Sequence, residues 1–214
     1  MIISRHRRFI FFAVPKTGTH SVRRALRPHL AEDDLEQVGL FVQKRFPFPE
    51  LNAIGHGHLS VRQVHPVLGA ETFDNYFKFA FVRNPFDRFV SYCAFMSRQT
   101  GSFEVAPQAF MRHIVRDAPP WQHVLFRPQH EMLVDAAGRV AMDMLGRVEN
   151  MQADYDRICG HIGIPSTKLE QVNASRHRPY MEYYDDELRS LVARMYARDF
   201  ELLGYDADAH ADTR

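Results

Sequence analysis

Residues 9–21 have the sequence FIFFAVPKTGTHS, in which an apolar run leads into a glycine turn. Phe9 to Val14 are continuously apolar, as expected of a strand buried on both faces of a parallel sheet. Pro15 to Gly18 have the composition of a turn. Apolar residues then recur at helical spacing, at Val22, Ala25, Leu26 and Leu30. The pattern predicts a strand, a loop and a helix, with a solvated helix face formed by Arg23, Arg24 and Arg27.

A strand followed by a helix recurs after residue 75. Phe77 to Val82 predict a second buried strand, and Asn84 before Pro85 is a typical helix start. A third strand is expected within Val140 to Val148, before a helix capped by Asn150. Both segments repeat the order found at the start of the chain.

Two further regions complete the predicted organisation. Residues 31–75 contain scattered proline and glycine, which predict short helices and loops. A last helix is expected from near Asp185 to Gly204. Strands that alternate with helices predict an α/β fold, a parallel β-sheet flanked by helices. With 214 residues, the chain is expected to form a single domain over 1–214.

Composition argues against several classes of partner. The 27 Lys and Arg residues nearly balance the 26 Asp and Glu residues, so no global field attracts nucleic acid or another polyanion. The longest apolar run, Phe9 to Val14, is far shorter than the ~20 residues that cross a bilayer, so no membrane span is expected. Cys93 and Cys159 lie on apolar helix faces and are expected to be buried thiols in a reducing compartment.

The loop from Pro15 to Ser21 carries the groups of an anion site. A tight turn between strand and helix directs backbone N–H groups and the positive helix end at one point. Gly18 permits close approach of an anion, and Lys16 adds a mobile charge. The order differs from a Walker A loop, because the lysine precedes the glycine. The alternative is an ordinary glycine turn with exposed hydroxyls.

A second group of polar residues follows the second predicted strand. Arg83 ends that strand, and Ser91 lies about two turns into the next helix, so the pair is suited to hold a second phosphate. The alternative is that Asp87 and Arg88 lie on a solvated face and that Ser91 is incidental. Both motifs fall at the carboxyl ends of predicted strands, where α/β sheets bind their ligands.

The segment Gly55-His56-Gly57-His58 places two histidines at alternate positions. A metal site is not expected, because no third ligand with a recognisable spacing accompanies them. A purely structural pair remains an alternative. An imidazole that titrates near neutral pH suits a general base that removes a proton from an attacking hydroxyl.

The two phosphate motifs together resemble a known family, the sulfotransferases that use 3′-phosphoadenosine-5′-phosphosulfate (PAPS). The similarity is greatest to the carbohydrate branch, which includes heparan sulfate 2-O-sulfotransferase and the chondroitin enzymes. That family has a PKTGTxS-like loop for the 5′-phosphosulfate and an RNPxxRxxSxY-like segment for the 3′-phosphate. The resemblance extends from about Phe9 to Tyr205 and implies the P-loop-NTPase-like sulfotransferase fold.

The resemblance implies roles for individual residues. The residues expected at the 5′ end of PAPS are Lys16, Thr17, Gly18, Thr19, His20 and Ser21. Arg83 and Ser91 are expected at the 3′-phosphate. The two histidines match a stretch in which the family's histidines are catalytic, so His58 is expected to be the base, with His56 as its support or substitute.

Two weaker segments also resemble the family. Arg127 and Gln129, in a Phe-Arg-Pro-Gln patch, are expected near the acceptor, although a plain loop is an equal alternative. Ser175 and Arg176 belong to a late loop that closes over the nucleotide in this branch, so they are expected near PAPS. For this loop the alternative is a solvated run of charges.

The expected reaction is in-line transfer of a sulfuryl group from PAPS to a hydroxyl of a glycan or another acceptor. His58 would take the proton, and Lys16 would neutralise charge on the leaving oxygen. Eukaryotic members carry a Golgi anchor that the sequence does not show, so a bacterial cytoplasmic enzyme is expected; the oligomeric state is not encoded. Two rivals remain, a kinase with a degenerate P-loop and a non-catalytic nucleotide-binding module.

Overall fold

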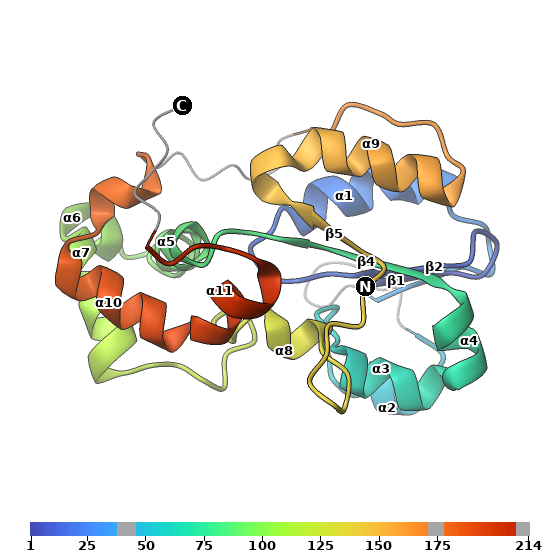
Figure 1. The fold of residues 1–214 in the computed structure, drawn as a ribbon, viewed down its shortest axis with the longest axis horizontal. Helices are drawn as coiled ribbons and strands as arrows, with labels where there is room; N and C mark the ends of the chain where they lie inside the picture. The colour runs from blue at the N-terminus through green and yellow to red at the C-terminus, as the bar shows by residue number, and fades with distance from the viewer. Residues whose placement is uncertain (38–45, 171–177, 209–214) are drawn as a thin grey trace. The chain divides into compact units, whose positions relative to one another are not determined.

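A computed structural model describes residues 1–37, 46–170 and 178–208 of the chain (Figure 1). The chain divides into two compact units, each described by itself. The first unit comprises residues 1–82 and 131–172, and the second comprises residues 83–130 and 173–214. The expectation of a single domain over 1–214 stays a prediction.

Among the described residues of the first unit, five strands form one sheet in the order β3-β1-β2-β4-β5. They are β1 (Ile2–Ser4), β2 (Phe9–Phe12), β3 (Leu35–Glu36), β4 (Phe77–Val82) and β5 (Met144–Arg147). β2, β4 and β5 are parallel, which confirms the predicted α/β sheet. β1 is antiparallel to both β2 and β3. The sequence does not predict this antiparallel edge, because strands of two and three residues are too short to show a period.

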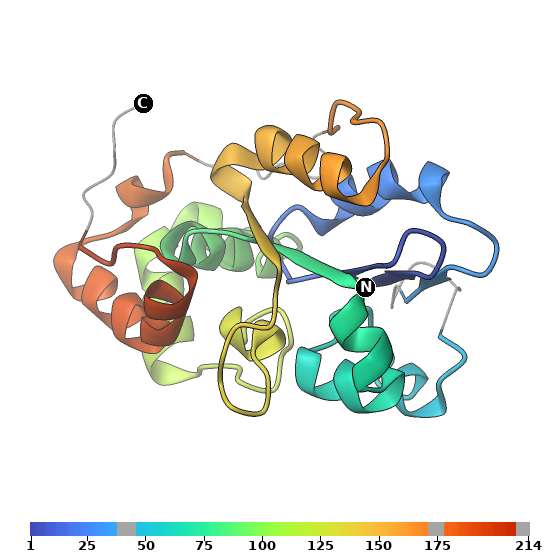
Figure 2. The same ribbon diagram turned by 45° about the vertical axis from the view of Figure 1, so that its right-hand side comes forward.

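Helices cover both faces of this sheet (Figures 1 and 2). One face carries α1 (Thr19–Leu26) and α9 (Met151–Ile162), and the other carries α2 (Pro49–Asn52), α3 (Val61–Leu68) and α4 (Ala70–Asn75). Strand side chains alternate between the faces. Phe9 and Phe11 pack in the cluster that contains Val22 of α1 and Ile158 of α9, whereas the Phe12 ring meets Phe73 of α4. Burial on both sides therefore explains the continuous apolar run.

The second unit is helical. Its helices are α5 (Pro85–Met96), α6 (Ser102–Val105), α7 (Pro107–Arg112), α10 (Asp186–Met195) and α11 (Ala197–Leu203), with a π-helical turn at His113–Asp117. Their apolar sides form one core around Phe86, Phe89 and Phe126. A short 3₁₀ turn occurs in this unit at Tyr180–Tyr183, and the first unit has two, at Arg27–His29 and Val148–Asn150. Helix α8 (His130–Leu133) begins with the last residue of one segment of the second unit and continues into the first unit.

The last predicted helix is two helices. Asp185 caps α10 by accepting a hydrogen bond from Leu188 N at 2.9 Å, and Gly204 ends α11 in the left-handed conformation, as expected for the two ends. Between them Tyr196 leaves helical geometry, and its buried hydroxyl donates to Phe126 O at 2.9 Å. No glycine or proline marks this interruption, so the sequence pattern does not predict it.

Asn84 and Asn150 precede helices as predicted, but they act differently. Asn84 Oδ1 accepts a hydrogen bond from Phe86 N at 3.0 Å, and Pro85 follows in the first helical position. The Asn150 side chain makes no cap hydrogen bond. Instead Asp154 of α9 accepts a hydrogen bond from Arg147 N at 2.8 Å, which ties the helix to the end of β5.

Two further expectations concern thiols and membranes. Cys93 and Cys159 are buried and free, as predicted. Among residues 1–37, 46–170 and 178–208, no helix has both the length and the apolar character needed to cross a bilayer.

Close packing of β5 against β4 gives a test of the fold. A Cβ at Gly146 would lie 2.6 Å from Phe81 Cε1, so Gly146→Ala must displace that ring. We expect a loss of about 1–3 kcal/mol in the free energy of unfolding, measured by urea denaturation. Gly160→Ala in α9 is the matched control, because its Cβ would meet no atom within 4 Å. Helix propensity should make that variant about 0.5–1 kcal/mol more stable, so equal changes in the two variants would contradict the packing described.

Candidate functional site

The anion loop, residues Pro15–Ser21, connects β2 to α1 at the carboxyl end of a parallel strand. Two of its residues have a left-handed backbone, Lys16 with φ 67° and Gly18 with φ 72°. For a lysine this conformation costs about 1–2 kcal/mol, and strain of this kind concentrates at functional sites. At Gly18 an added Cβ would also lie 2.6 Å from Met151 Cε. Lys16 therefore holds a backbone conformation that costs energy, and Gly18 has no room for a side chain.

Helix α1 begins without a side-chain cap. Gly18 occupies the N-cap position and has no side chain with which to satisfy the first amides. Its carbonyl accepts a hydrogen bond from Ser21 N at 3.0 Å. The first turn carries no acidic residue, so no carboxylate of that turn offsets the positive end of the helix. This end of α1 is suited to an anion.

The polar side chains of the anion loop lie partly inside the protein. Thr17, Thr19 and Ser21 are buried, and Thr17 Oγ1 donates to Val14 O at 2.9 Å. The Thr17 hydroxyl can therefore still accept a hydrogen bond, while its proton is engaged. Desolvation lowers the pKa of His20, and the charges of Arg23, Lys16 and Arg27 lower it further. These cations make the electrostatic potential at the loop positive.

His58 is held by the segment that leads into the anion loop. Its Nδ1 lies 2.6 Å from Ala13 O. A carbonyl oxygen can only accept, so Nδ1 carries the proton, and Nε2 of the neutral ring has the lone pair. Desolvation by burial lowers the pKa of His58 to about 3, although the Ala13 hydrogen bond raises it and the charge of Arg23 lowers it. At pH 7 the ring is therefore neutral and has one nitrogen able to accept a proton.

His56 has the opposite pattern of hydrogen bonding. Its Nδ1 accepts from His58 N at 3.3 Å, so Nε2 carries the proton in the neutral ring. Burial lowers the pKa of His56 as well, and the two ring centroids lie 6.1 Å apart. Sequence alone left both histidines as candidate bases. The hydrogen bonds favour His58, because only its neutral ring has an unprotonated Nε2.

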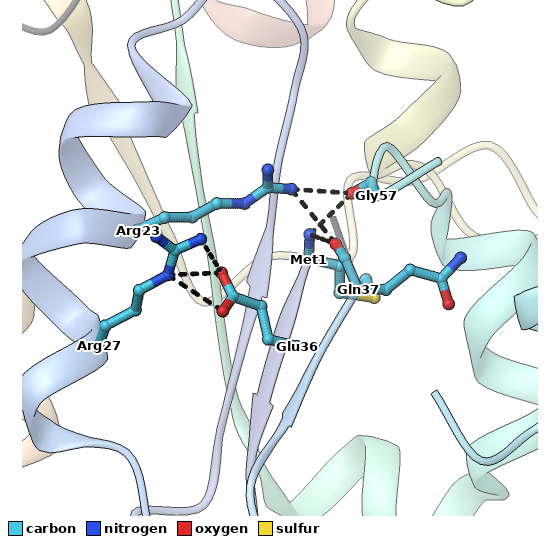
Figure 3. A network of polar contacts seen from close by, with 6 residues as sticks. All are labelled: Met1, Arg23, Arg27, Glu36, Gln37 and Gly57. Atoms are coloured by element: carbon cyan, nitrogen blue, oxygen red, sulfur yellow. Dashed lines mark hydrogen bonds and ion pairs between the residues drawn. The ribbon is translucent and has the colours of Figure 1, made fainter. Parts of the chain in front are cut away.

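Gly57, between the two histidines, lies at a crowded point (Figure 3). Its carbonyl accepts hydrogen bonds from the Met1 nitrogen at 2.7 Å and from Arg23 Nη2 at 3.3 Å. A Cβ at this position would lie 2.1 Å from Gln37 O and 2.7 Å from Arg23 Nη2. No larger residue fits without moving the backbone of residue 37, so the histidine spacing depends on this glycine.

Arg23 corrects one expectation. The helical pattern predicts a solvated arginine, yet Arg23 is only 3% exposed, while Arg24 and Arg27 do lie at the surface. Arg23 stands four residues after Thr19 and three before Leu26, and both of these residues are buried, so all three share one helix face.

Arg83 lies in the second unit, directly after the last residue of β4. Its Nε and Nη2 donate to Asp87 Oδ2 and Oδ1 at 2.7 and 2.8 Å, a bidentate ion pair one helical turn apart. Its backbone is held as well, because Gln129 Nε2 donates to Arg83 O at 2.8 Å and Arg83 N donates to Gln129 Oε1 at 3.0 Å. Both the guanidinium and the peptide of Arg83 are therefore oriented.

The residues after Arg83 do not form a solvated face. Arg88 is 2% exposed, and its Nη2 donates to Leu125 O at 3.0 Å and to Arg127 O at 2.8 Å. Ser91 is also buried. The alternative of an incidental, solvated Asp87 and Arg88 is wrong for these residues, because both lie in ordered contacts.

Gln129 is fully buried in a network that includes the last helix. Gln129 N and His130 N each donate to the Asp199 carboxylate at 2.8 Å, and His130 Nδ1 lies 2.7 Å from Asp199 Oδ1. Arg127, by contrast, is exposed. The sequence did not indicate Asp199, since a lone carboxylate in an amphipathic helix has no distinguishing pattern. An acceptor contact by Arg127 or Gln129 stays a prediction.

The predicted site residues thus fall into two groups. The anion loop and both histidines lie in the first unit, and Arg83, Ser91, Arg127 and Gln129 lie in the second. Ser175 and Arg176 lie outside the described residues. In the part of the chain that the structure describes, no three His, Cys, Asp or Glu side chains are grouped so that they could hold a metal ion.

The sequence profile of the Sulfotransferase family matches residues 1–206. This range covers nearly the whole chain and includes the anion loop, both histidines and the segment from Arg83 to Ser91. The chain belongs to the sulfotransferase family. Family membership establishes sulfuryl transfer as the general class of reaction. Searches of curated proteins and of solved structures found no match.

In this sulfotransferase the buried His58 makes stability depend on pH. Its pKa is about 3 in the folded state and 6.5 in the unfolded chain, so the unfolded chain binds more protons between these values. Stability should therefore fall as the pH decreases below about 6.5, by up to about 1.4 kcal/mol per pH unit. His58→Asn, which can still donate to Ala13 O, should lose less. Urea unfolding at pH 7 and pH 5 compares the two proteins, and identical losses would contradict the low pKa.

Proposed function

We propose that this sulfotransferase transfers the sulfuryl group of PAPS to an acceptor hydroxyl, with His58 as the general base. The observation that carries the proposal is the 2.6 Å contact between His58 Nδ1 and Ala13 O. Ala13 lies two residues before the anion loop, on the chain that leaves β2. The same short segment therefore orients the base and begins the site for the sulfuryl donor.

The anion loop fits the 5′-phosphosulfate of PAPS. The uncapped start of α1, the left-handed Lys16 and Gly18, and the surrounding cations together provide amide donors and positive potential. Lys16, Thr17, Gly18, Thr19, His20 and Ser21 are the residues that would hold this end. The buried hydroxyls of Thr19 and Ser21 add candidate hydrogen-bond donors.

Arg83 and Ser91 are the residues that would hold the 3′-phosphate. The Asp87 carboxylate orients the Arg83 guanidinium, much as a carboxylate orients a metal-bound histidine, and a phosphate would then share or displace that ion pair. The buried Gln129 supports this role by holding the Arg83 backbone. Its predicted contact with the acceptor stays a prediction. Ser175 and Arg176 remain proposed contacts of the nucleotide.

The reaction requires one proton transfer and one exchange of bonds at sulfur. The acceptor oxygen forms a bond to sulfur as the bond from sulfur to the 5′-phosphate oxygen breaks. PAPS would supply the sulfuryl group and leave as the 3′,5′-diphosphate. His58 Nε2 accepts the hydroxyl proton, and the Lys16 charge neutralises the departing oxygen. An anion bound beside the loop would raise the pKa of His58, because negative charge favours the imidazolium.

The acceptor and the location of the enzyme follow from family resemblance. A hydroxyl of a glycan is the proposed acceptor, with exposed Arg127 as a candidate contact. Location in a bacterial cytoplasm stays a prediction.

Ligand-dependent unfolding tests the proposed donor. At 100 times its Kd, 3′,5′-ADP should add about 2.7 kcal/mol of stability, which corresponds to about 5–10 °C in Tm for a chain of this size. Lys16→Ala and Arg83→Ala should each lose most of this shift. Arg24→Ala removes a surface arginine of α1 and is the matched control, which should keep the shift. Stronger stabilisation by Mg-ATP than by 3′,5′-ADP would favour a kinase and overturn the proposal.

Turnover tests the proposed base. His58→Asn keeps a donor for Ala13 O but has no titratable nitrogen, so kcat should fall about 10²- to 10⁴-fold, while the Kd of 3′,5′-ADP stays the same. His56→Asn should have a smaller effect, because the neutral His56 ring has its proton on Nε2. The measurement is sulfuryl transfer from PAPS to a panel of sugars. An unchanged kcat in His58→Asn would rule out His58 as the general base. Binding of 3′,5′-ADP without any turnover by the wild type would favour a non-catalytic nucleotide-binding module.

A further inference from the structure

Arg23 is a buried cation that the proposed reaction does not yet use. Its side chain leaves α1 and reaches the carbonyls of Gly57 and Gln37 (Figure 3), with Nη2 at 3.3 and 3.5 Å from the two oxygens. These are long contacts, so attraction between a charge and two carbonyl dipoles dominates over hydrogen bonding. The Nε atom is buried and has no hydrogen-bond partner among the described residues.

The surroundings of Arg23 keep its charge at physiological pH. Burial lowers the pKa of Arg23 to about 10, the Glu36 carboxylate raises it, and Arg27 lowers it. Glu36 itself pairs with Arg27, whose Nε and Nη2 lie 3.1–3.2 Å from the carboxylate oxygens. The Met1 nitrogen contacts the same two carbonyls as Arg23, at 3.1 Å from Gln37 O and 2.7 Å from Gly57 O. Desolvation by burial, and then the charge of Arg23, lower the pKa of the Met1 amine well below its ordinary value, so Arg23 is the group that keeps a positive charge beside these carbonyls.

Burying an incompletely paired cation costs free energy, and the Arg23 contacts offset part of that cost by joining two segments of the site. Arg23 lies one turn into the helix whose first residues belong to the anion loop. Gly57 O, its partner, lies between His56 and His58. The guanidinium thus connects the helix of the anion loop directly to the segment that carries the proposed base.

We propose that Arg23 is a positioning residue that holds the segment from His56 to His58 against α1 and that its charge adds to burial in disfavouring protonation of His58. This inference rests on the proposed function, in which His58 is the base. A merely structural arginine would be expected to affect stability alone. Arg23 should in addition affect the protonation and the position of the His58 ring.

The charges that face His58 agree with this role. After burial and the Ala13 hydrogen bond, Arg23 has the largest effect on the pKa of His58, followed by the Met1 amine and His56, and all three lower it. Removing the Arg23 charge should therefore make His58 easier to protonate. Burial, the largest cause of the low pKa of His58, would remain, so the change should be partial.

Imidazole ¹⁵N NMR of the full chain tests the inference without requiring turnover. In the wild type, His58 should stay neutral, with its proton on Nδ1, over the pH range in which the protein is folded. In Arg23→Gln, His58 should begin to protonate at a higher pH. Arg24→Gln is the matched control on the same helix, since Arg24 is exposed and pairs with Glu170 at the surface. A His58 titration that is the same in wild type and Arg23→Gln would overturn the proposal.

A second variant, Arg23→Lys, tests the positioning role apart from the charge. It also keeps the proposal testable if Arg23→Gln does not fold. Lysine keeps a positive charge but lacks the planar fork that reaches two carbonyls. His58 should stay neutral, whereas kcat should fall about tenfold with an unchanged Kd for 3′,5′-ADP, because the base is displaced. Wild-type kcat in Arg23→Lys would overturn the positioning role. If the wild type transfers no sulfuryl group, the proposed function fails, while the NMR titration still decides whether Arg23 controls His58.

Discussion

Burial of β2 on both faces is the constraint on which the rest of the first unit depends. Its phenylalanines alternate between the cluster with α1 and α9 and the side covered by α4, so neither face can be left to solvent. β2 also pairs in parallel with β4, so the chain that leaves β2 must cross over the sheet before it forms β4. The chain therefore turns sharply at Pro15, and the amides at the start of α1 and the Lys16 charge gather at the end of β2.

The polar part of this unit is organised around backbone carbonyls. Ala13 O fixes the tautomer of His58, and Gly57 O and Gln37 O accept from Arg23 and from the Met1 nitrogen. Carbonyl oxygens do not titrate, so they can orient a histidine or hold a cation without changing state between pH 3 and pH 10. Burial then lowers the pKa of both histidines, and the result is a neutral, oriented pair beside a positive loop.

In the second unit, side chains rather than backbone carbonyls orient Arg83. Its guanidinium pairs with Asp87 one turn along α5, and its peptide is held by the Gln129 amide. Gln129 in turn depends on Asp199, which reaches it from α11 through the Gln129 N–H group. A residue at the end of the chain thus supports a residue after β4. Arg83 is therefore held by a shell of polar residues, Asp87, Gln129 and Asp199.

The sequence by itself determined the features that depend on near neighbours: the buried strands, the turn at Gly18, the Asn84 cap and the motifs that indicate a sulfotransferase. Each of these is set by residues within a few positions of one another. Only the tertiary structure decided the burial of Arg23, the different hydrogen bonds of the His56 and His58 rings, and the link from Gln129 to Arg83. Those depend on partners 34, 45 and 46 residues away, respectively, because hydrogen bonds and desolvation act between groups that folding brings together from distant parts of the chain.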